Sequence, residues 1–411
     1  MTKRIVLVLA AFPQLSESFI VSKFTSLVDE GWDVQIVCNA YHSEIAQVFP
    51  QLTRNPSITR RIHKNPPNRA RWLAALLFPV VLVNTLVRNI SGSLRYLSNG
   101  IRLHGLKTLA RFYTDSAIIA LKPDLIHFEF GATAAGRADI ASLLGCKTIV
   151  SFRGYDLNFS GLDQPDFYKD VWRFADGFHF LGDDLRQRGL KRGCPPEKPF
   201  VMIPPAIDCE FFKPVNLKTY EEISASRPLR ILSVGRLEWK KGYEFAFQAI
   251  TQLLDAGVPC DYHIVGDGAN LEPLAFARHQ LGLDDVVKFH GAQPREKVRE
   301  ELLWADLFLH SAVSEGFCNA VLEAQAMQVP VVCSDADGLS ENVAHGVTGF
   351  VVPRRDPAAL AERMRQLAIS PELRERLGIA GRERVTHSFR LSDQVNQFEA
   401  FYQRILDRDE D

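Results

Sequence analysis

The sequence predicts an α/β protein with two parallel-sheet domains. Apolar segments of strand length alternate with segments of helical period in both halves of the chain. A length of 411 residues is enough for two domains, each with its own core. The proline-rich segment 203–214 and the polar stretch 215–228 interrupt this alternation. The interruption predicts a domain boundary near 206–228.

The first half starts with a strand, a helix and a second strand, which is the usual start of a parallel sheet. Ser16 is a candidate cap for a helix that runs to about Glu30, and Gly31 ends it. The expected strands of this half are 5–9, 33–38, 123–130, 147–151, 177–181 and 199–203.

The second half repeats the alternation. We expect strands at 229–234, 261–265, 286–289 and 306–310, and helices at 243–256, 271–281 and 295–304. Near the end of the chain, apolar residues repeat at intervals of four and three and must be buried; they are Leu391, Val395, Phe398, Tyr402 and Ile405. We therefore assign 1–205 to the first domain, 206–390 to the second and 391–411 to a terminal helix.

Composition indicates an ordinary globular chain, with 46% apolar residues, 24% charged residues and a net charge of −1. The seven cysteines are scattered without a CxxC pair, so no zinc site or disulfide framework is expected. Charge is uneven between the halves. Residues 1–205 hold 25 basic and 17 acidic residues, or +8, and residues 206–411 hold 23 and 32, or −9.

Residues 45–114 contain eleven basic residues and no acidic one. Within them, Trp72–Val87 is apolar but shorter than the roughly 20 residues of a membrane span. One interpretation is a surface that docks on anionic lipid; the other is a buried helix with solvated arginines at its ends. No signal peptide is recognisable. We expect a cytoplasmic protein that can attach to the inner face of the plasma membrane.

The stretch Ser311–Pro330 has the pattern of a strand end, a loop and a helix start, with Asn319 as a candidate N-cap. Glu315 precedes this helix and Glu323 lies one turn into it. A helix N-terminus suits a diphosphate, and two carboxylates beside it suit sugar hydroxyls. A nucleotide diphosphate sugar has both. The alternative is a helix with a solvated glutamate on each side of its cap.

Three segments resemble the family-4 retaining glycosyltransferases. They are Gly235-Arg236 followed by Lys241-Gly242, then Glu315 with Glu323 seven residues on, then Pro330–Val352. The resemblance implies a GT-B fold, in which two Rossmann-like domains face each other across a cleft and the terminal helix crosses back to the first domain. It also implies retention of anomeric configuration and no metal ion. The loop FPQLSESFI is similar to a segment of the exopolysaccharide transferases of the colanic acid and amylovoran type.

The resemblance implies a donor site in the second domain. Arg236, Lys241 and the helix start would stabilise the departing diphosphate, Glu315 would orient the hexose and Glu323 would bind the ribose. The expected donor contacts are Gly235, Arg236, Lys241, Gly266, Gly291, Ala292, Glu315, Gly316, Phe317, Asn319, Ala320 and Glu323.

In the first domain, Arg153 and Glu129 stand where the family usually has histidine. Arginine cannot act as a base, but Arg153 could clamp a phosphate. Glu129 could orient the acceptor hydroxyl. The alternative is a structural ion pair between the two residues.

The function expected from these features is hexose transfer from a nucleotide sugar to a glycan or polyprenyl-linked acceptor in bacterial envelope synthesis. Neither a cofactor nor a nucleic acid partner is expected. Three alternatives stay open: a non-catalytic binding protein, a sugar-nucleotide epimerase, and a manganese-dependent transferase that uses Asp335 and Asp337.

Overall fold

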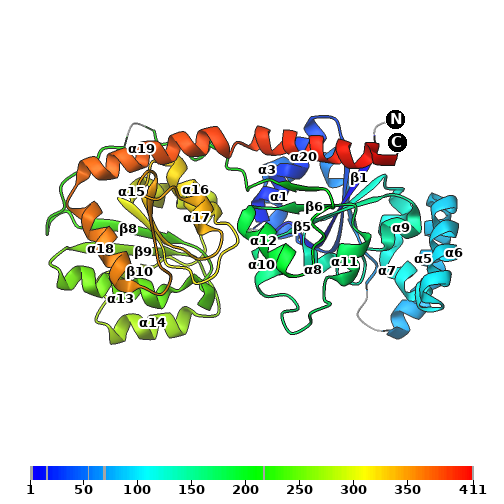
Figure 1. Cartoon of the computed structure of the whole chain (residues 1–411), viewed down its shortest axis with the longest axis horizontal. Coiled ribbons are helices and arrows are strands. Elements are labelled where there is room, and N and C mark those ends of the chain that lie inside the picture. The colour runs from blue at the N-terminus through cyan, green and yellow to red at the C-terminus, as the bar shows by residue number, and fades with distance from the viewer. Residues whose placement is uncertain (1–2, 15–16, 54, 68–70, 216–217, 410–411) are drawn as a thin grey trace. The chain divides into compact units, whose positions relative to one another are not determined.

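The computed structural model of the chain describes residues 3–14, 17–53, 55–67, 71–215 and 218–409 (Figure 1). The chain divides into two compact units. The first comprises Met1–Ile203 together with Gln394–Asp411, and the second comprises Pro204–Asp393.

The first unit is built on a parallel sheet of seven strands in the order β3-β2-β1-β4-β5-β6-β7. The strands are β1 (Arg4–Phe12), β2 (Asp33–Tyr41), β3 (Ile62–Lys64), β4 (Leu125–Phe128), β5 (Lys147–Phe152), β6 (Gly177–Phe180) and β7 (Phe200–Met202). Its central strands are apolar and buried, as expected for a sheet covered on both faces.

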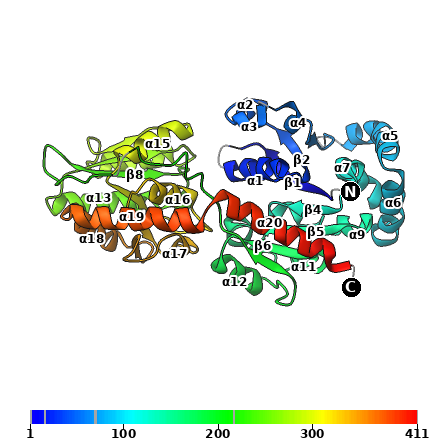
Figure 2. The same cartoon turned by 90° about the horizontal axis from the view of Figure 1, so that it is seen from above.

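Helices connect these strands (Figures 1 and 2). They are α1 (Ser18–Asp29), α2 (Ser43–Ala46), α3 (Pro50–Thr53), α4 (Pro56–Thr59), α5 (Arg71–Arg88), α6 (Ile90–His104), α7 (Lys107–Leu121), α8 (Gly131–Ala134), α9 (Ile140–Leu144), α10 (Gly154–Asn158), α11 (Lys169–Phe174) and α12 (Asp183–Lys191). The N-cap position of α1 is Glu17, and the predicted cap Ser16 lies outside the described residues.

The second unit has a parallel sheet of six strands in the order β10-β9-β8-β11-β12-β13. The strands are β8 (Leu229–Val234), β9 (Cys260–Val265), β10 (Val287–Phe289), β11 (Leu307–His310), β12 (Val331–Ser334) and β13 (Gly349–Val352). The helices are α13 (Tyr243–Asp255), α14 (Leu271–Gln280), α15 (Arg295–Trp304), α16 (Asn319–Ala326), α17 (Leu339–Asn342), α18 (Pro357–Ala368) and α19 (Pro371–Ser388). The strands and helices predicted between residues 229 and 310 are all present, with ends shifted by at most one residue.

The terminal helix α20 (Leu391–Leu406) packs on the first unit, as the sequence predicts. Of the predicted stripe, Val395, Phe398, Tyr402 and Ile405 are buried, and Leu391 is half-buried. Tyr402 also contributes a polar contact, because its hydroxyl lies 2.7 Å from Nδ1 of His127 on β4.

A chain of buried hydrogen bonds continues from this contact across the sheet. His127 Nε2 lies 2.7 Å from Ser151 Oγ, which lies 2.7 Å from His179 Nδ1. His179 Nε2 donates to the carbonyl oxygen of Ile203 at 2.8 Å. Burial and the nearby cations Lys23 and Arg153 lower the pKa values of both histidines well below the ordinary value, so both imidazoles are neutral at pH 7. Because the Ile203 carbonyl can only accept, neutral rings give each link one direction: Tyr402 donates to His127, His127 to Ser151, and Ser151 to His179.

Helix α5 contains the apolar segment Trp72–Val87, and the interpretation of this segment as a buried helix is wrong. Trp72, Leu76, Val80, Val83 and Val87 recur every three or four residues and are 60–76% exposed. They form one apolar stripe along the helix. Among the described residues, no helix combines the length and apolar character needed to cross a bilayer.

Candidate active site

The candidate site lies where the strand order of the second sheet reverses, between β8 and β11. Loops that follow the two strands at such a point run to opposite sides and leave a crevice at their carboxyl ends. Gly235 and Arg236 follow β8, and Glu315 lies in the loop after β11. The topology therefore brings together the first two sequence segments that indicated a donor site.

Lys241 and Glu315 form a salt bridge between these two loops, through Lys241 Nζ and Glu315 Oε2. The backbones are joined as well, because Val313 N–H donates to the carbonyl oxygen of Lys240 at 2.8 Å and Ser311 Oγ donates to that of Lys241 at 3.2 Å. Lys241, which was predicted to stabilise the diphosphate, is thus in direct contact with Glu315, which was predicted to orient the hexose.

The Lys241–Glu315 pair stays fully ionised at neutral pH. Burial alone would raise the pKa of Glu315, but Lys241 and His310 together hold it far below its usual range. Burial opposes the charge of Lys241 as well, yet the carboxylate of Glu315 keeps the pKa of Lys241 raised. The site therefore presents a fixed positive and a fixed negative group side by side.

His310 and Cys318 complete this cluster, and sequence analysis missed both. His310 Nε2 lies 3.5 Å from Glu315 Oε2. The side chains of His310 and Cys318 are buried. Burial opposes ionisation of both His310 and Cys318, but their mutual attraction raises the pKa of His310 and lowers that of Cys318. His310, Glu315 and Cys318 could offer three ligands to a metal ion. Such an ion would first have to displace the Lys241 ammonium group.

Helix α16 begins at Asn319, so the prediction of Asn319 as N-cap is wrong. Cys318 occupies the cap position, and no side chain of the described residues caps the helix there. Asn342 instead fixes the cap residue, since its side chain accepts from Cys318 N–H and donates to Cys318 O, both at 3.1 Å. The N–H groups of the first turn, which begins with Asn319 and Ala320, are left available for an anion.

Glu323 lies one turn into α16 and is only partly exposed. Burial raises the pKa of its carboxyl group to about 7, and Arg295 opposes this shift only weakly. Glu323 therefore changes its charge near neutral pH, in contrast to Glu315.

Gly235, Gly266 and Gly291 come together at the carboxyl ends of β8, β9 and β10. Gly266 N–H donates to the carbonyl oxygen of Gly291 at 2.8 Å, and Gly266 has a φ of +149°. A Cβ atom on Gly266 would lie 1.9 Å from the carbonyl oxygen of Gly235. Only glycine fits this crossing of two backbones.

The remaining predicted donor contacts differ in exposure. Arg236 is more than half exposed, with its Nη1 atom 3.0 Å from Glu238 Oε1. Ala292 is exposed, whereas Gly316 is buried. Phe317 is buried against Phe389, with ring centroids 6.0 Å apart. The Phe317 side chain is thus part of the core rather than of the site surface.

Asp335 and Asp337, the candidate manganese ligands, are both bound to Arg354. Arg354 Nε lies 3.3 Å from Asp335 and Nη1 lies 3.0 Å from Asp337. Asp337 also accepts hydrogen bonds from Ser314 Oγ at 2.6 Å and from Glu315 N–H at 3.1 Å. Its role in the fold is to position the Glu315 loop. The DxD pattern was visible in the sequence, but its pairing with Arg354 was not.

In the first unit, Arg153 and Glu129 are buried and paired. Arg153 Nη2 lies 3.1 Å from Glu129 Oε2, and Lys23 Nζ on α1 binds the other carboxylate oxygen. Glu129 is 0% exposed, and Arg153 also stacks on Phe19 at 4.2 Å. These contacts favour the alternative of a structural ion pair, extended by Lys23, which the sequence analysis did not single out.

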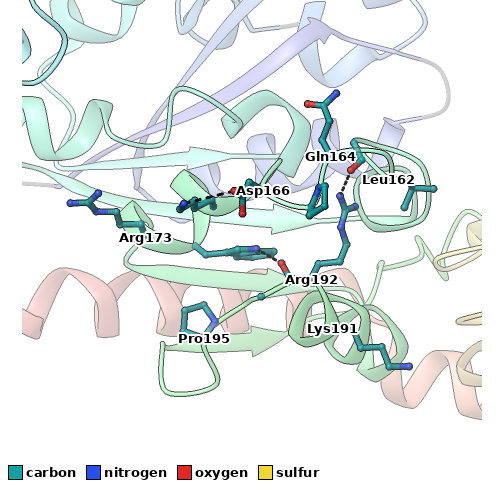
Figure 3. Close-up of a pocket in the computed structure, with 12 residues that line it drawn as sticks. Leu162, Gln164, Asp166, Arg173, Lys191, Arg192 and Pro195 are labelled. Atoms are coloured by element: carbon teal, nitrogen blue, oxygen red, sulfur yellow. Dashed lines mark hydrogen bonds and ion pairs between the residues drawn. The ribbon is translucent and has the colours of Figure 1, made fainter.

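A separate hollow of about 750 Å³ lies in the first unit between the 161–166 loop, α11 and the end of α12 (Figure 3). Arg192 forms one wall and is held to the carbonyl oxygen of Gly161 at 3.0 Å. Arg173 and Lys191 lie at opposite sides of the rim (Figure 3). None of the predicted site residues lines this hollow.

Comparison with known proteins gives the identity of the region that holds the Lys241–Glu315 pair. A family described as "Glycosyl transferases group 1" matches residues 220–384. Residues 220–384 are a group 1 glycosyltransferase domain. This span includes Arg236, Lys241, Glu315 and Glu323.

The relatives of this glycosyltransferase extend over most of the chain. A putative colanic acid biosynthesis glycosyltransferase of Escherichia coli K12, WcaL, is 28% identical, and the match covers 93% of this chain and 95% of WcaL. The amylovoran biosynthesis glycosyltransferase AmsK of Erwinia amylovora is 29% identical, with 87% and 88% covered. The similarity to the colanic acid and amylovoran type, predicted from a nine-residue loop, is confirmed.

Solved structures confirm the GT-B fold of the glycosyltransferase. Sucrose-phosphate synthase from Thermosynechococcus elongatus has a TM-score of 0.70 at 19% identity, with 98% of this chain and 99% of that chain covered. HepE from Anabaena, in complex with UDP and glucose, has a TM-score of 0.72 at 16% identity, with 98% and 100% covered.

Proposed function

We propose that this glycosyltransferase moves a hexose from a nucleotide diphosphate sugar to a glycan or polyprenyl-linked acceptor, with retention of configuration and without a metal ion. The acceptor belongs to bacterial exopolysaccharide synthesis in this proposal, because the relatives that match most of the chain are named for that process. HepE, which shares the fold, binds UDP and glucose in its solved structure.

The observation that carries the proposal is the Lys241–Glu315 pair in front of α16. In the transfer step, the bond between the anomeric carbon and the diphosphate oxygen breaks, and the acceptor hydroxyl oxygen bonds to the same face of the sugar. The hydroxyl proton leaves with the diphosphate. Negative charge builds up on the departing oxygen, where Lys241, Arg236 and the first-turn N–H groups of α16 would stabilise it.

Glu315 would then act on the sugar. Its ionised carboxylate is an acceptor for hexose hydroxyl groups, and its loop is fixed by Asp337. Glu323, Gly291 and Ala292 would contact the nucleoside. A metal ion is not needed in this scheme, because protein cations supply the positive charge and Arg354 binds both aspartates of the DxD pattern.

A thermal-shift screen of the purified chain against UDP-, GDP-, ADP- and CMP-linked sugars tests donor binding first. Transfer is then measured with the donor that stabilises most, and the anomeric configuration of the product is read by NMR. We expect full activity in EDTA and the donor's configuration in the product. An inverted product refutes retention, loss of activity in EDTA refutes metal independence, and binding without transfer favours a non-catalytic protein.

The α5–α7 surface supports attachment to an anionic membrane, where a polyprenyl-linked acceptor would be found. Eleven of the 24 exposed large apolar side chains of the described residues lie between Trp72 and Leu109. Arg88 and Arg102 are exposed beside them, and residues 45–114 contain no acidic group. An apolar stripe with basic neighbours suits a surface of anionic lipids.

A further inference from the structure

A second cluster of potential metal ligands lies in the glycosyltransferase domain, apart from the Lys241–Glu315 pair. It consists of His263 on β9, His290 just after β10, and Glu301 on α15. One ligand atom from each side chain lies within 4.8 Å of the other two. Because β10 is the edge strand, the cluster sits at the border of the sheet.

One ring nitrogen of His290 is free to take a further partner. His290 Nε2 is buried and has no hydrogen-bond partner among the described residues. A buried ring nitrogen without a partner destabilises the folded chain, and a bound metal ion would supply that partner. A neutral imidazole ring offers one nitrogen lone pair to a metal ion.

The other two ligands are already held next to each other. His263 Nδ1 lies 2.8 Å from Glu301 Oε2, and the His263 ring stacks on Trp304 with centroids 3.8 Å apart at 9°. The His263 and His290 rings are 4.4 Å apart. These ring contacts limit the movement of both imidazoles, as the contacts around metal ligands do in known metal sites.

We propose that His263, His290 and Glu301 bind a divalent transition-metal ion of the zinc class. Two imidazoles and one carboxylate form a known ligand set for zinc that leaves positions open for water, and each side chain is partly exposed on one side. Imidazoles bind a metal ion in their neutral form, so the bound ligand set carries a net charge of −1, which favours a cation. The ion would join β9, the end of β10 and α15, and it takes no part in sugar transfer.

Zinc binding to the full chain is measured by calorimetry after removal of bound metal, with thermal unfolding as a second readout. We expect one equivalent of zinc at this site and a higher Tm in its presence. His290→Asn and Glu301→Gln should each weaken zinc binding at least about tenfold and abolish the rise in Tm. Cobalt in place of zinc should give ligand-field absorption without a thiolate charge-transfer band.

The matched control is His279→Asn, because His279 lies 2.8 Å from Asp284 without a third ligand among the described residues. This variant should bind zinc as the wild type does. Equal affinity in wild type and His290→Asn would overturn the proposal. A thiolate band that disappears in Cys318→Ser would instead assign the metal to His310, Glu315 and Cys318.

Discussion

Lys241 and Glu315 form an ion pair that is mostly buried. Each group keeps the other ionised in a place where burial would otherwise neutralise it. In the proposed mechanism, the donor meets charges that are already in position, so little reorganisation is needed at the moment of transfer.

Arg236→Ala and Lys241→Ala should lower turnover on the order of 10²-fold, because each removes positive charge from the departing diphosphate. Arg236 is the cleaner test, since it is more than half exposed and its loss leaves no buried partner. Steady-state transfer rates measure the effect. The exposed Lys297→Ala is the control. A loss below about threefold in Arg236→Ala contradicts the assigned role.

Glu323 should make stability depend on pH. Its pKa of about 7 lies above the ordinary value of 4.5, so the folded chain holds a proton that the unfolded chain releases. The contribution of Glu323 to the unfolding free energy is fully present below pH 4.5 and is lost as pH rises through 7. As pH rises from 5 to 8, the unfolding free energy of Glu323→Gln should increase by about 1–3 kcal/mol relative to that of the wild type. Urea unfolding measures this change, with exposed Glu296→Gln as a control that should show none.

Substitution of Glu129 tests whether this residue stabilises the fold or orients the acceptor hydroxyl. Burial opposes its charge, but Lys23 and Arg153 hold its pKa below the ordinary range. Glu129→Gln leaves two buried cations facing each other and should cost about 3–5 kcal/mol in unfolding free energy. Exposed Glu30→Gln serves as the control. Unchanged stability with loss of transfer would favour the acceptor role.

At the scale of elements, α20 is fixed by packing and by the hydrogen-bond chain that starts at Tyr402. Burial, with Lys23 and Arg153 nearby, keeps the pKa values of His127 and His179 well below the ordinary value. The folded rings therefore stay neutral well below pH 6.5, and the hydrogen-bond chain is intact at neutral pH. The stability that they contribute is complete above pH 6.5 and is lost as pH falls toward their lowered pKa values. The attachment of α20 to the sheet therefore depends on the protonation of His127 and His179.

Tyr402→Phe should lower the unfolding free energy by about 1–2 kcal/mol, because His127 Nδ1 loses its donor in a buried place. Chemical denaturation at pH 8 measures this loss. The exposed Tyr155→Phe should change nothing. If Tyr402→Phe is as stable as wild type, the hydrogen-bond chain does not hold the helix.

The elements also show what the sequence could predict. The strand β8 and helix α15 match their predicted ranges because apolar period and length define them. The helices α6 and α7 were not predicted, and the burial of α5 was left open, because their exposed apolar side chains disturb the usual pattern of one buried face. Motifs identified Lys241 and Glu315, but His310 and Cys318 reach the site only through folding.

At the scale of the whole molecule, charge is divided between the halves of the chain, with +8 in residues 1–205 and −9 in residues 206–411. At physiological salt, interactions between exposed charges act over roughly 8 Å. The positive half also holds the apolar α5 stripe, and each basic group near an anionic bilayer contributes about 1 kcal/mol. Charge and apolar contact thus favour the same surface for lipid binding.

The full chain should co-sediment with vesicles that contain phosphatidylglycerol, and less with pure phosphatidylcholine or at high salt. Leu76→Ser with Val80→Ser removes apolar contact, and Arg60→Glu with Arg88→Glu removes charge; each pair should release most of the bound protein. Arg61 is unsuitable for this test, since it pairs with Asp33 at 2.9 Å. Phe276→Ser, at a 64% exposed position on α14, is the matched control and should bind as wild type does. Equal sedimentation of wild type and both pairs means that this surface faces another partner.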